Sequence, residues 1–172
     1  MDELLVDFKS ESKELVDQML ELLEEAEDDG LDVKLKLDEY GQLVDRIMGS
    51  ATSLCMVVED SRYLEKIGHY AEICKIVGYK GSQLENEQFF IVVVAMLLDA
   101  TEMLQIMLKE LGTTSERDLK DIITDTFLER LRFINSQFDE NLRGTVATQG
   151  RDDANSSTQS QIDSLLAALG VG

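Results

Sequence analysis

Hydrophobic residues recur with helical spacing along most of this 172-residue chain. Apolar positions three, four and seven residues apart fall on one face of an α-helix, so such stripes predict amphipathic helices. In residues 2–28 the stripe is made by Phe8, Leu15, Met19, Leu22 and Leu23. Asp and Glu crowd the opposite side, and Gly30 follows the stripe, which predicts that the first helix ends there.

The same spacing predicts four further helices. They cover about residues 35–58, 60–77, 85–111 and 116–140. Gly78 and Gly81 are expected to stop the third of these helices, and Gly112 the fourth. The fourth begins apolar almost all round, which is typical of the most deeply buried helix of a bundle. Because no strand pattern of convincing length competes and the connections are short, we expect an all-α, antiparallel bundle of four to five helices.

The composition changes near the C-terminus. Residues 143–160 are dominated by Gly, Thr, Gln, Asp, Asn and Ser, which predicts a flexible linker. Residues 161–172 then carry an apolar stripe of their own, made by Ile162, Leu165, Leu166 and Leu169. A helix this short is marginal alone in water and usually folds into a partner's groove. We therefore expect a bundle domain at 1–142 and a partner-binding peptide at 161–172, with packing of this peptide on its own bundle as the alternative.

Charge and composition limit the classes of partner that this chain is expected to bind. The formal net charge is −19 and the pI about 4.2, which disfavours nucleic acid and anionic membranes as partners. The N-terminus lacks a signal-peptide pattern, and no apolar run is expected to reach membrane-spanning length. These features predict a cytoplasmic protein.

Few cysteine or histidine residues are candidates for a catalytic or metal-binding role. Cys55 and Cys74 each lie inside an apolar helical pattern, which favours buried structural thiols over reactive or metal-binding ones. His69 is the only histidine, and we expect it to be a packed or surface helical residue. No metal site is predicted in this chain.

Three segments carry a first resemblance. They are Phe8-Lys9-Ser10-Glu11-Ser12, Ile47-Met48-Gly49-Ser50-Ala51 and the phrase Leu64 to Glu72. With them, residues 1–111 resemble the histidine-containing phosphotransfer domain of CheA-type chemotaxis kinases, a family that docks response-regulator receivers. Asp45 stands where that family places its phosphorylated histidine, and Met48 replaces the lysine before the glycine. The resemblance therefore implies a docking frame without the phosphate carrier.

A second resemblance lies on the same predicted helix. The run Asp38-Glu39-Tyr40-Gly41-Gln42-Leu43-Val44-Asp45-Arg46 is similar to the catalytic helix of CheZ phosphatases, with an Asp and a Gln four residues apart and a Gly before the Gln. Residues four apart project from one face of a helix, and Asp45 extends that row. A solvated face of an amphipathic helix is the simpler interpretation of the same spacing.

The resemblance to CheZ implies hydrolysis of the aspartyl phosphate of a CheY-type receiver, with Mg²⁺ bound by the receiver itself. Gln42 would orient the attacking water, since an amide carries both a donor and an acceptor. Asp38 would pair with the receiver's active-site lysine. Whether Asp45 assists or only replaces the lost histidine stays open.

The C-terminal peptide adds to this resemblance. Asp163, the pair Leu165-Leu166 and Leu169-Gly170 match the receiver-binding tail of CheZ, and residues 160–166 are similar to the receiver-binding peptide of the flagellar switch protein FliM. The implied binding residues are Ile162, Asp163, Leu165, Leu166 and Leu169. A tether of this kind raises the effective concentration of the receiver near the catalytic helix.

Two other functions stay open at this stage. One is a non-catalytic pseudo-phosphotransfer module that binds or sequesters a receiver, and the other is a structural subunit of a chemosensory array. The CheZ family is built as a long dimeric four-helix assembly, whereas this chain is expected to form a compact bundle, so a homodimer is also left open.

Overall fold

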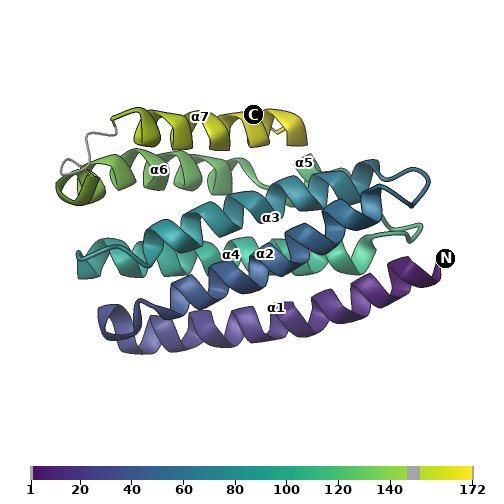
Figure 1. Cartoon of the computed structure of the whole chain (residues 1–172), viewed down its shortest axis with the longest axis horizontal. Coiled ribbons are helices and arrows are strands. Elements are labelled where there is room, and N and C mark those ends of the chain that lie inside the picture. Colours follow the sequence, from purple (N-terminus) through teal and green to yellow (C-terminus); the bar gives the residue numbers. More distant parts are fainter. Residues whose placement is uncertain (1, 147–151, 172) are drawn as a thin grey trace.

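The computed structural model describes the backbone of residues 2–146 and 152–171, and the side chains of residues 2–138 and 159–171. All regular structure in these residues is helical, which confirms the all-α prediction. Four long helices form an antiparallel bundle (Figure 1): α1 Glu3–Asp29, α2 Lys36–Cys55, α3 Arg62–Gly81 and α4 Glu87–Glu110. A short 3-10 helix, η1 Gly30–Val33, connects the first two.

The remaining helices lie along one side of this bundle. They are α5 Leu119–Ile122, α6 Asp125–Val146 and α7 Asp152–Leu169. Of these, α6 contacts α4, and α7 contacts both α3 and α6 (Figure 1). Adjacent helices in the four-helix core are α1 and α2, α2 and α3, α3 and α4, and α4 and α1. The edge between α1 and α4 is therefore opposite the edge between α2 and α3.

Two predicted helix boundaries need correction. The fifth predicted helix, 116–140, is two helices, because the hydroxyl of Thr124 accepts a hydrogen bond from the Phe127 amide (3.1 Å) and caps a new start. The third helix ends at Gly81, one of its two predicted stop residues, but runs through the other, Gly78. The glycine that looked like a stop signal is instead a contact point inside the helix.

Tyrosine and glycine pack reciprocally between α2 and α3. The ring of Tyr40 lies on Gly78, where an added Cβ would come within 2.8 Å of the Tyr40 Cδ1. The ring of Tyr79 lies on Gly41, where an added Cβ would come within 2.8 Å of the Tyr79 Cε1. Each helix can thus receive a tyrosine ring from the other only because it has a glycine, with no side chain, at the point of contact. This arrangement fixes the rotation of α2 against α3.

Buried hydroxyl groups tie both helices to α4. The Thr101 hydroxyl donates its hydrogen bond to the Leu97 carbonyl (2.7 Å). The Tyr40 hydroxyl is therefore the donor in its own hydrogen bond to the Thr101 oxygen (2.9 Å). Tyr70 on α3 donates to the Ala100 carbonyl (2.6 Å). Both tyrosines are fully buried, and such groups are costly to bury without a partner. The hydrogen bonds therefore select one register of α2 and α3 on α4.

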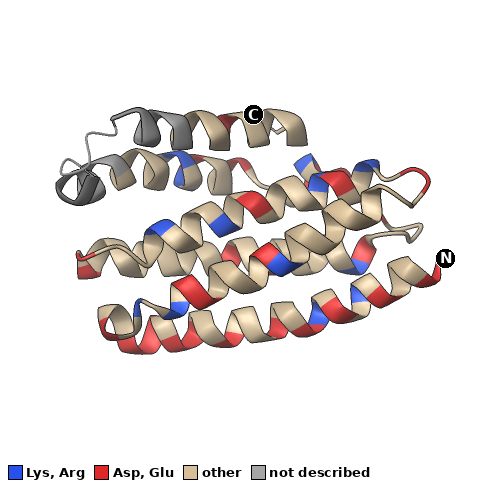
Figure 2. Cartoon of the chain, in the orientation of Figure 1, with Lys and Arg blue, Asp and Glu red and all other residues tan. Residues whose placement is uncertain are grey.

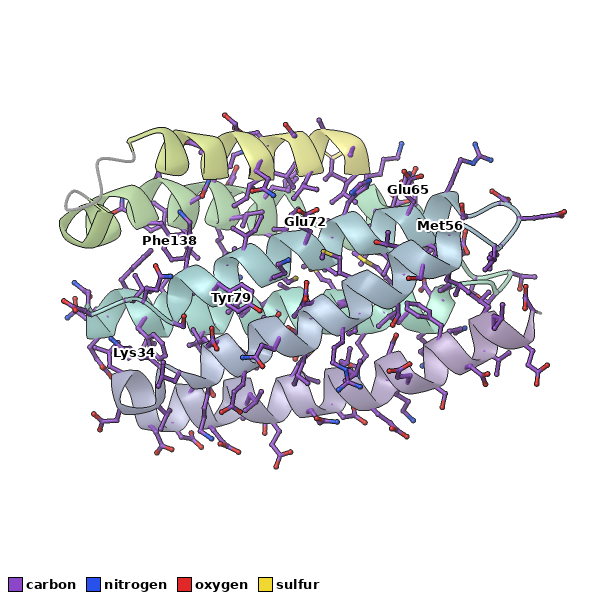
Figure 3. The ribbon with its side chains drawn as sticks, in the orientation of Figure 1. Lys34, Met56, Glu65, Glu72, Tyr79 and Phe138 are labelled. Carbon is purple, nitrogen blue, oxygen red and sulfur yellow. The ribbon has the colours of Figure 1, made fainter. Side chains whose placement is uncertain are left out.

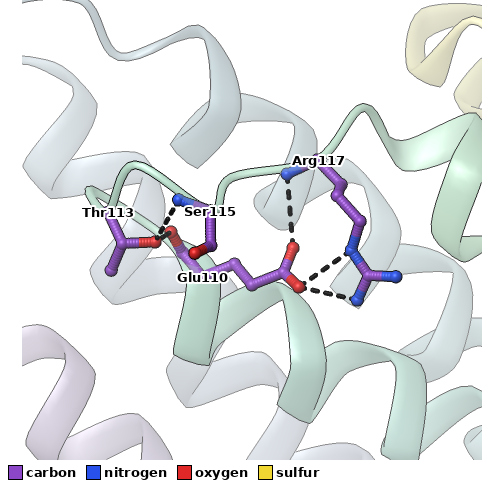
Figure 4. A network of polar contacts seen from close by, with 4 residues as sticks. All are labelled: Glu110, Thr113, Ser115 and Arg117. Atoms are coloured by element: carbon purple, nitrogen blue, oxygen red, sulfur yellow. Dashed lines mark hydrogen bonds and ion pairs between the residues drawn. The ribbon is translucent and has the colours of Figure 1, made fainter.

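The turn after α4 is held by a compact polar network (Figure 4). Arg117 donates from Nε (2.9 Å) and from its terminal guanidinium nitrogen (2.6 Å) to the Glu110 carboxylate, which also accepts the Arg117 amide (3.2 Å). Thr113 donates to the Glu110 carbonyl and accepts from the Ser115 amide. The guanidinium holds the pKa of the Glu110 carboxyl below its usual range. This network directs the chain back over the bundle.

The C-terminal peptide packs on the bundle in this structure. Its apolar side chains are buried: Ile162, Leu165, Leu166 and Leu169. Gln161 donates to the Glu72 carboxylate of α3 at 3.0 Å (Glu72 is labelled in Figure 3). The helix α7 begins inside the segment 143–160 that was expected to be a linker, of which residues 147–151 lie outside the described residues. The alternative weighed from the sequence, docking on the chain's own bundle, is the observed arrangement.

One expectation about α4 also needs correction. By length and composition this helix, with a mean hydropathy of 1.9 over its most apolar window, could cross a membrane, although no run of that length was expected. Half of that window is buried inside the bundle. Phe90, Val93 and Leu97 of this helix are buried, whereas Ile91 and Val92, in the all-apolar start that predicted the deepest helix, are exposed.

We expect the substitution Gly78→Ala to lower the free energy of unfolding by about 1–3 kcal/mol, because the new methyl group meets the ring of the fully buried Tyr40. The matched control is Gly49→Ala on α2, where nothing lies within 4 Å of an added Cβ. This control should be neutral or more stable by up to about 1 kcal/mol. Urea denaturation measures both, and equal effects of the two variants would contradict the packing described.

Candidate functional site

The row formed by Asp38, Gln42 and Asp45 lies on the outward face of α2. Gln42 is exposed, and its Nε2 donates to the Asp38 Oδ2 at 2.9 Å. Asp38 is only partly exposed. Because the amide nitrogen is engaged with Asp38, the Gln42 Oε1 points away from this carboxylate as a hydrogen-bond acceptor.

The two carboxylates of the row have different surroundings. The Lys75 ammonium on α3 lies 2.9 Å from the Asp45 Oδ1 and neutralises that charge. Among the residues whose side chains the structure describes, none forms an ion pair with Asp38. Asp38 is therefore the member of the row that can accept a cation from a partner, whereas Asp45 already has one.

Tyr79 of α3 completes the face (Figure 3). Its ring packs on Gly41, directly before Gln42 in the chain. Partial burial raises the pKa of the Tyr79 hydroxyl, and the charges of Asp45 and Asp38 raise it further. The phenol of Tyr79 therefore stays protonated near both carboxylates. Its ring, packed on Gly41, also restricts the movement of α2 at the row.

Lys75 and Tyr79 were missed as site residues from the sequence. Their spacing of four residues, on a helix whose other face is apolar, was the available signal. Nothing local indicated that this polar pair would face the row on α2, because the pairing depends on the tertiary contact between Tyr79 and Gly41.

The row lies on an open helix face beside a shallow hollow between α1 and α2. This hollow has a volume of about 480 Å³, and Gln42, Glu39 and Arg46 contribute to its wall. Arg46 is also paired with Glu11 of α1, outside this hollow, at 3.4 Å. A face this open cannot enclose a small substrate, so the reacting group would have to be presented by another macromolecular surface.

Other candidate groups lie outside the row. His69 is partly exposed, and its Nε2 lies 3.9 Å from the Glu65 Oε1 on the same helix. Cys74 is buried, which raises the pKa of its thiol to about 12, and Cys55 is partly buried with a raised thiol pKa. No group of three or more His, Cys, Asp or Glu side chains within the described residues is arranged to hold a metal ion.

The residues expected to bind a receiver through the tail are divided by the structure. The apolar members, Ile162, Leu165, Leu166 and Leu169, face the bundle and are buried. Asp163 is exposed on the outer side of α7. In this arrangement the tail offers a partner its polar face, and its apolar stripe becomes accessible only if α7 leaves α3.

Comparison of the chain with protein-family models, with curated proteins and with solved structures found no match. Any function assigned to the row therefore rests on its residues and their geometry.

We expect Cys74 to be unreactive in the folded protein. A thiol with a pKa of about 12 is thiolate to only about one part in 10⁴ near pH 8, and burial blocks access as well. A Cys55→Ser variant isolates this group, so labelling with a chromogenic disulfide should be slow in buffer and rapid in urea. Rapid labelling of the folded variant would show that Cys74 is exposed and contradict the core described.

Proposed function

We propose that this chain is a cytoplasmic phosphatase that hydrolyses the acyl phosphate on the receiver domain of a CheY-type response regulator. The observation that carries the proposal is the exposed Gln42 amide, oriented by its hydrogen bond to Asp38 on an open face. The resemblance of residues 38–46 to the catalytic helix of CheZ phosphatases supports the same chemistry.

Gln42 would act by positioning water. Its Nε2 is engaged with Asp38, which leaves Oε1 to accept a hydrogen bond from a water molecule. That water attacks the phosphorus in line with the bond to the aspartyl oxygen of the receiver. The phosphorus–oxygen bond breaks, and the products are the free aspartate carboxylate and inorganic phosphate. An amide does not titrate, so this positioning is the same throughout the physiological pH range.

Asp38 would anchor the partner. The receiver's active-site lysine carries a positive charge, and Asp38 is the carboxylate of the row without an ion pair among the described side chains. A charge-assisted hydrogen bond between them would seat the receiver so that its phosphoryl group faces Gln42. The Mg²⁺ used in this chemistry would be held by the receiver's own carboxylates. In this scheme Asp45 has no direct role, because Lys75 neutralises it.

A non-catalytic receiver-binding module is the second candidate. The pairing of Asp45 with Lys75 favours it, since Asp45 stands where the phosphotransfer family carries its phosphorylated histidine and is held here in an ion pair. Such a module would bind the receiver on the same face and leave the lifetime of its phosphate unchanged or longer.

We also propose that α7 recruits the receiver. The apolar stripe of α7 is buried against the bundle, so full engagement of the tail requires α7 to separate from α3. Tethering then raises the local concentration of the receiver near Gln42 without a strong contact at the row itself.

The first test uses Gln42→Ala. We expect this change to slow receiver dephosphorylation by about 10²-fold while receiver binding is retained, because the water loses its positioning group. Phosphate loss from a phosphorylated CheY-type receiver with Mg²⁺ measures the rate. The matched control is Gln105→Ala on α4, another exposed glutamine, on the opposite edge of the bundle. Equal rates for wild type and Gln42→Ala, or no acceleration by wild type, would rule out the proposed catalytic role.

A second test separates the two roles of α7. Leu166→Ala should lower the free energy of unfolding by about 2–5 kcal/mol, because this side chain of α7 is buried against the bundle. Asp163→Lys alters an exposed position and should change stability by no more than about 0.5 kcal/mol. If the tail recruits the receiver, Asp163→Lys weakens receiver binding in a titration. Unchanged binding would leave α7 with a structural role alone.

A further inference from the structure

The outward face formed by α1 and α4 has a basic end. Lys9, Lys13 and Lys109 surround a hollow of about 650 Å³ whose floor includes Val16 and Leu108, and no carboxylate lines it. Four other hollows on this acidic protein each include at least one Asp or Glu. Lys9 donates to two carbonyl oxygens at the end of α4, whereas no carboxylate among the described side chains pairs with Lys13 or Lys109. We call the whole surface the α1–α4 face.

The other end of the α1–α4 face is acidic. The last part of α1, residues 21–29, holds six Asp or Glu residues and no Lys or Arg. Figure 2 shows that the blue segments of α1 lie in its N-terminal half, among red ones, and that its C-terminal end carries red segments and no blue. Since α1 and α4 are antiparallel, the acidic end also carries the start of α4, where Glu87 accepts a hydrogen bond from the Leu31 amide.

The positions of these charges are self-complementary. Glu27 follows Lys9 by eighteen residues, which is five helical turns, and Glu24 follows Lys13 by eleven, close to three turns. All four residues therefore lie along one flank of α1. A two-fold axis that lies in the interface, perpendicular to α1 at the level of Gln18, places Lys9 opposite Glu27 of a second copy and Lys13 opposite Glu24. Both pairs form twice, as a symmetric dimer requires.

Apolar side chains lie between these charges. Ile91, Val92 and Ile106 on the outside of α4 are 46%, 42% and 38% exposed. Leu20 and Leu98, near the midpoint of the face, are only partly buried. An exposed apolar surface flanked by charged residues is typical of a site of protein association. A second copy would remove these side chains from water while its charges meet their complements.

The size of the face is sufficient for a specific interface. The 27 residues of α1 extend about 40 Å, and two adjacent helices span about 20 Å across, which gives roughly 800 Å² for each copy. Nucleic acid and anionic membranes fit poorly, because the acidic end and the net charge of −19 would repel them. We propose that two copies of this chain associate through the α1–α4 face, antiparallel about a two-fold axis.

This association is independent of the proposed function. The row on α2 lies on the edge between α2 and α3, opposite the α1–α4 face, so both rows of the dimer stay open to a partner. Variants that separate the two copies should therefore keep the phosphatase activity of each chain. Loss of the dimer and loss of activity are distinguishable outcomes.

Charge exchange tests the proposal on the full chain. Light scattering across a dilution series should give twice the 19.3 kDa chain mass for wild type. The basic-end variant Lys9→Glu with Lys13→Glu, and the acidic-end variant Glu24→Lys with Glu27→Lys, should each raise the dimer dissociation constant at least about tenfold. An equimolar mixture of the two variants should dimerise again, because each altered end then meets an opposite charge. This recovery also shows that both variants are folded.

The matched controls place the same charge changes elsewhere. Lys66→Glu with Lys120→Glu, and Glu59→Lys with Glu65→Lys, alter residues outside the α1–α4 face and should leave the dimer intact. A wild-type chain that stays at the monomer mass throughout the series would overturn the proposal. A dimer that survives both charge-exchange variants, or a mixture that stays monomeric, would overturn it as well.

Discussion

The reciprocal packing of tyrosine on glycine between α2 and α3 is the contact on which the rest of the structure depends. Tyr40 occupies the space over Gly78, and Tyr79 occupies the space over Gly41. The hydroxyl of Tyr40 is also held by Thr101 on α4, so the ring cannot turn away without losing a buried hydrogen bond. With the rotation of α2 determined in this way, its remaining face must point outward, and that face carries Asp38 and Gln42.

Electrostatics then divides the outward face into parts with different capacities. Lys75 neutralises Asp45, while Asp38 engages only the amide of Gln42 among the described side chains. A chain with a net charge of −19 thus keeps one carboxylate of the row available to a cation on a partner. Positive charge is also unevenly placed on the opposite edge of the bundle, where three lysines lie at one end of the α1–α4 face. On the α2 edge Lys75 thus pairs with one carboxylate of the row and leaves the other, whereas the lysines of the α1–α4 face lie apart from its acidic end.

The helices could be predicted because hydrophobic spacing is a local signal. Gly78 was misjudged because a glycine that ends a helix and a glycine that receives a ring look the same in sequence; only Tyr40 distinguishes them. The contribution of Lys75 and Tyr79 to the site was missed for the same reason, since it arises from a contact between helices. Docking of α7 could not be predicted from the spacing of Ile162 and Leu166. That spacing shows that α7 has an apolar stripe, but it does not show whether the bundle has a groove to receive the stripe.

Turnover by small amounts of the wild-type chain is the most direct test of the central claim, that this face hydrolyses a receiver's acyl phosphate. The measurement is the first-order rate of phosphate loss from a phosphorylated CheY-type receiver with Mg²⁺, with the chain well below the receiver in concentration. The account predicts that the rate rises in proportion to the chain and that each chain processes many receivers. A rate that is unchanged, or that falls as receiver is bound, would contradict catalysis and leave a binding module.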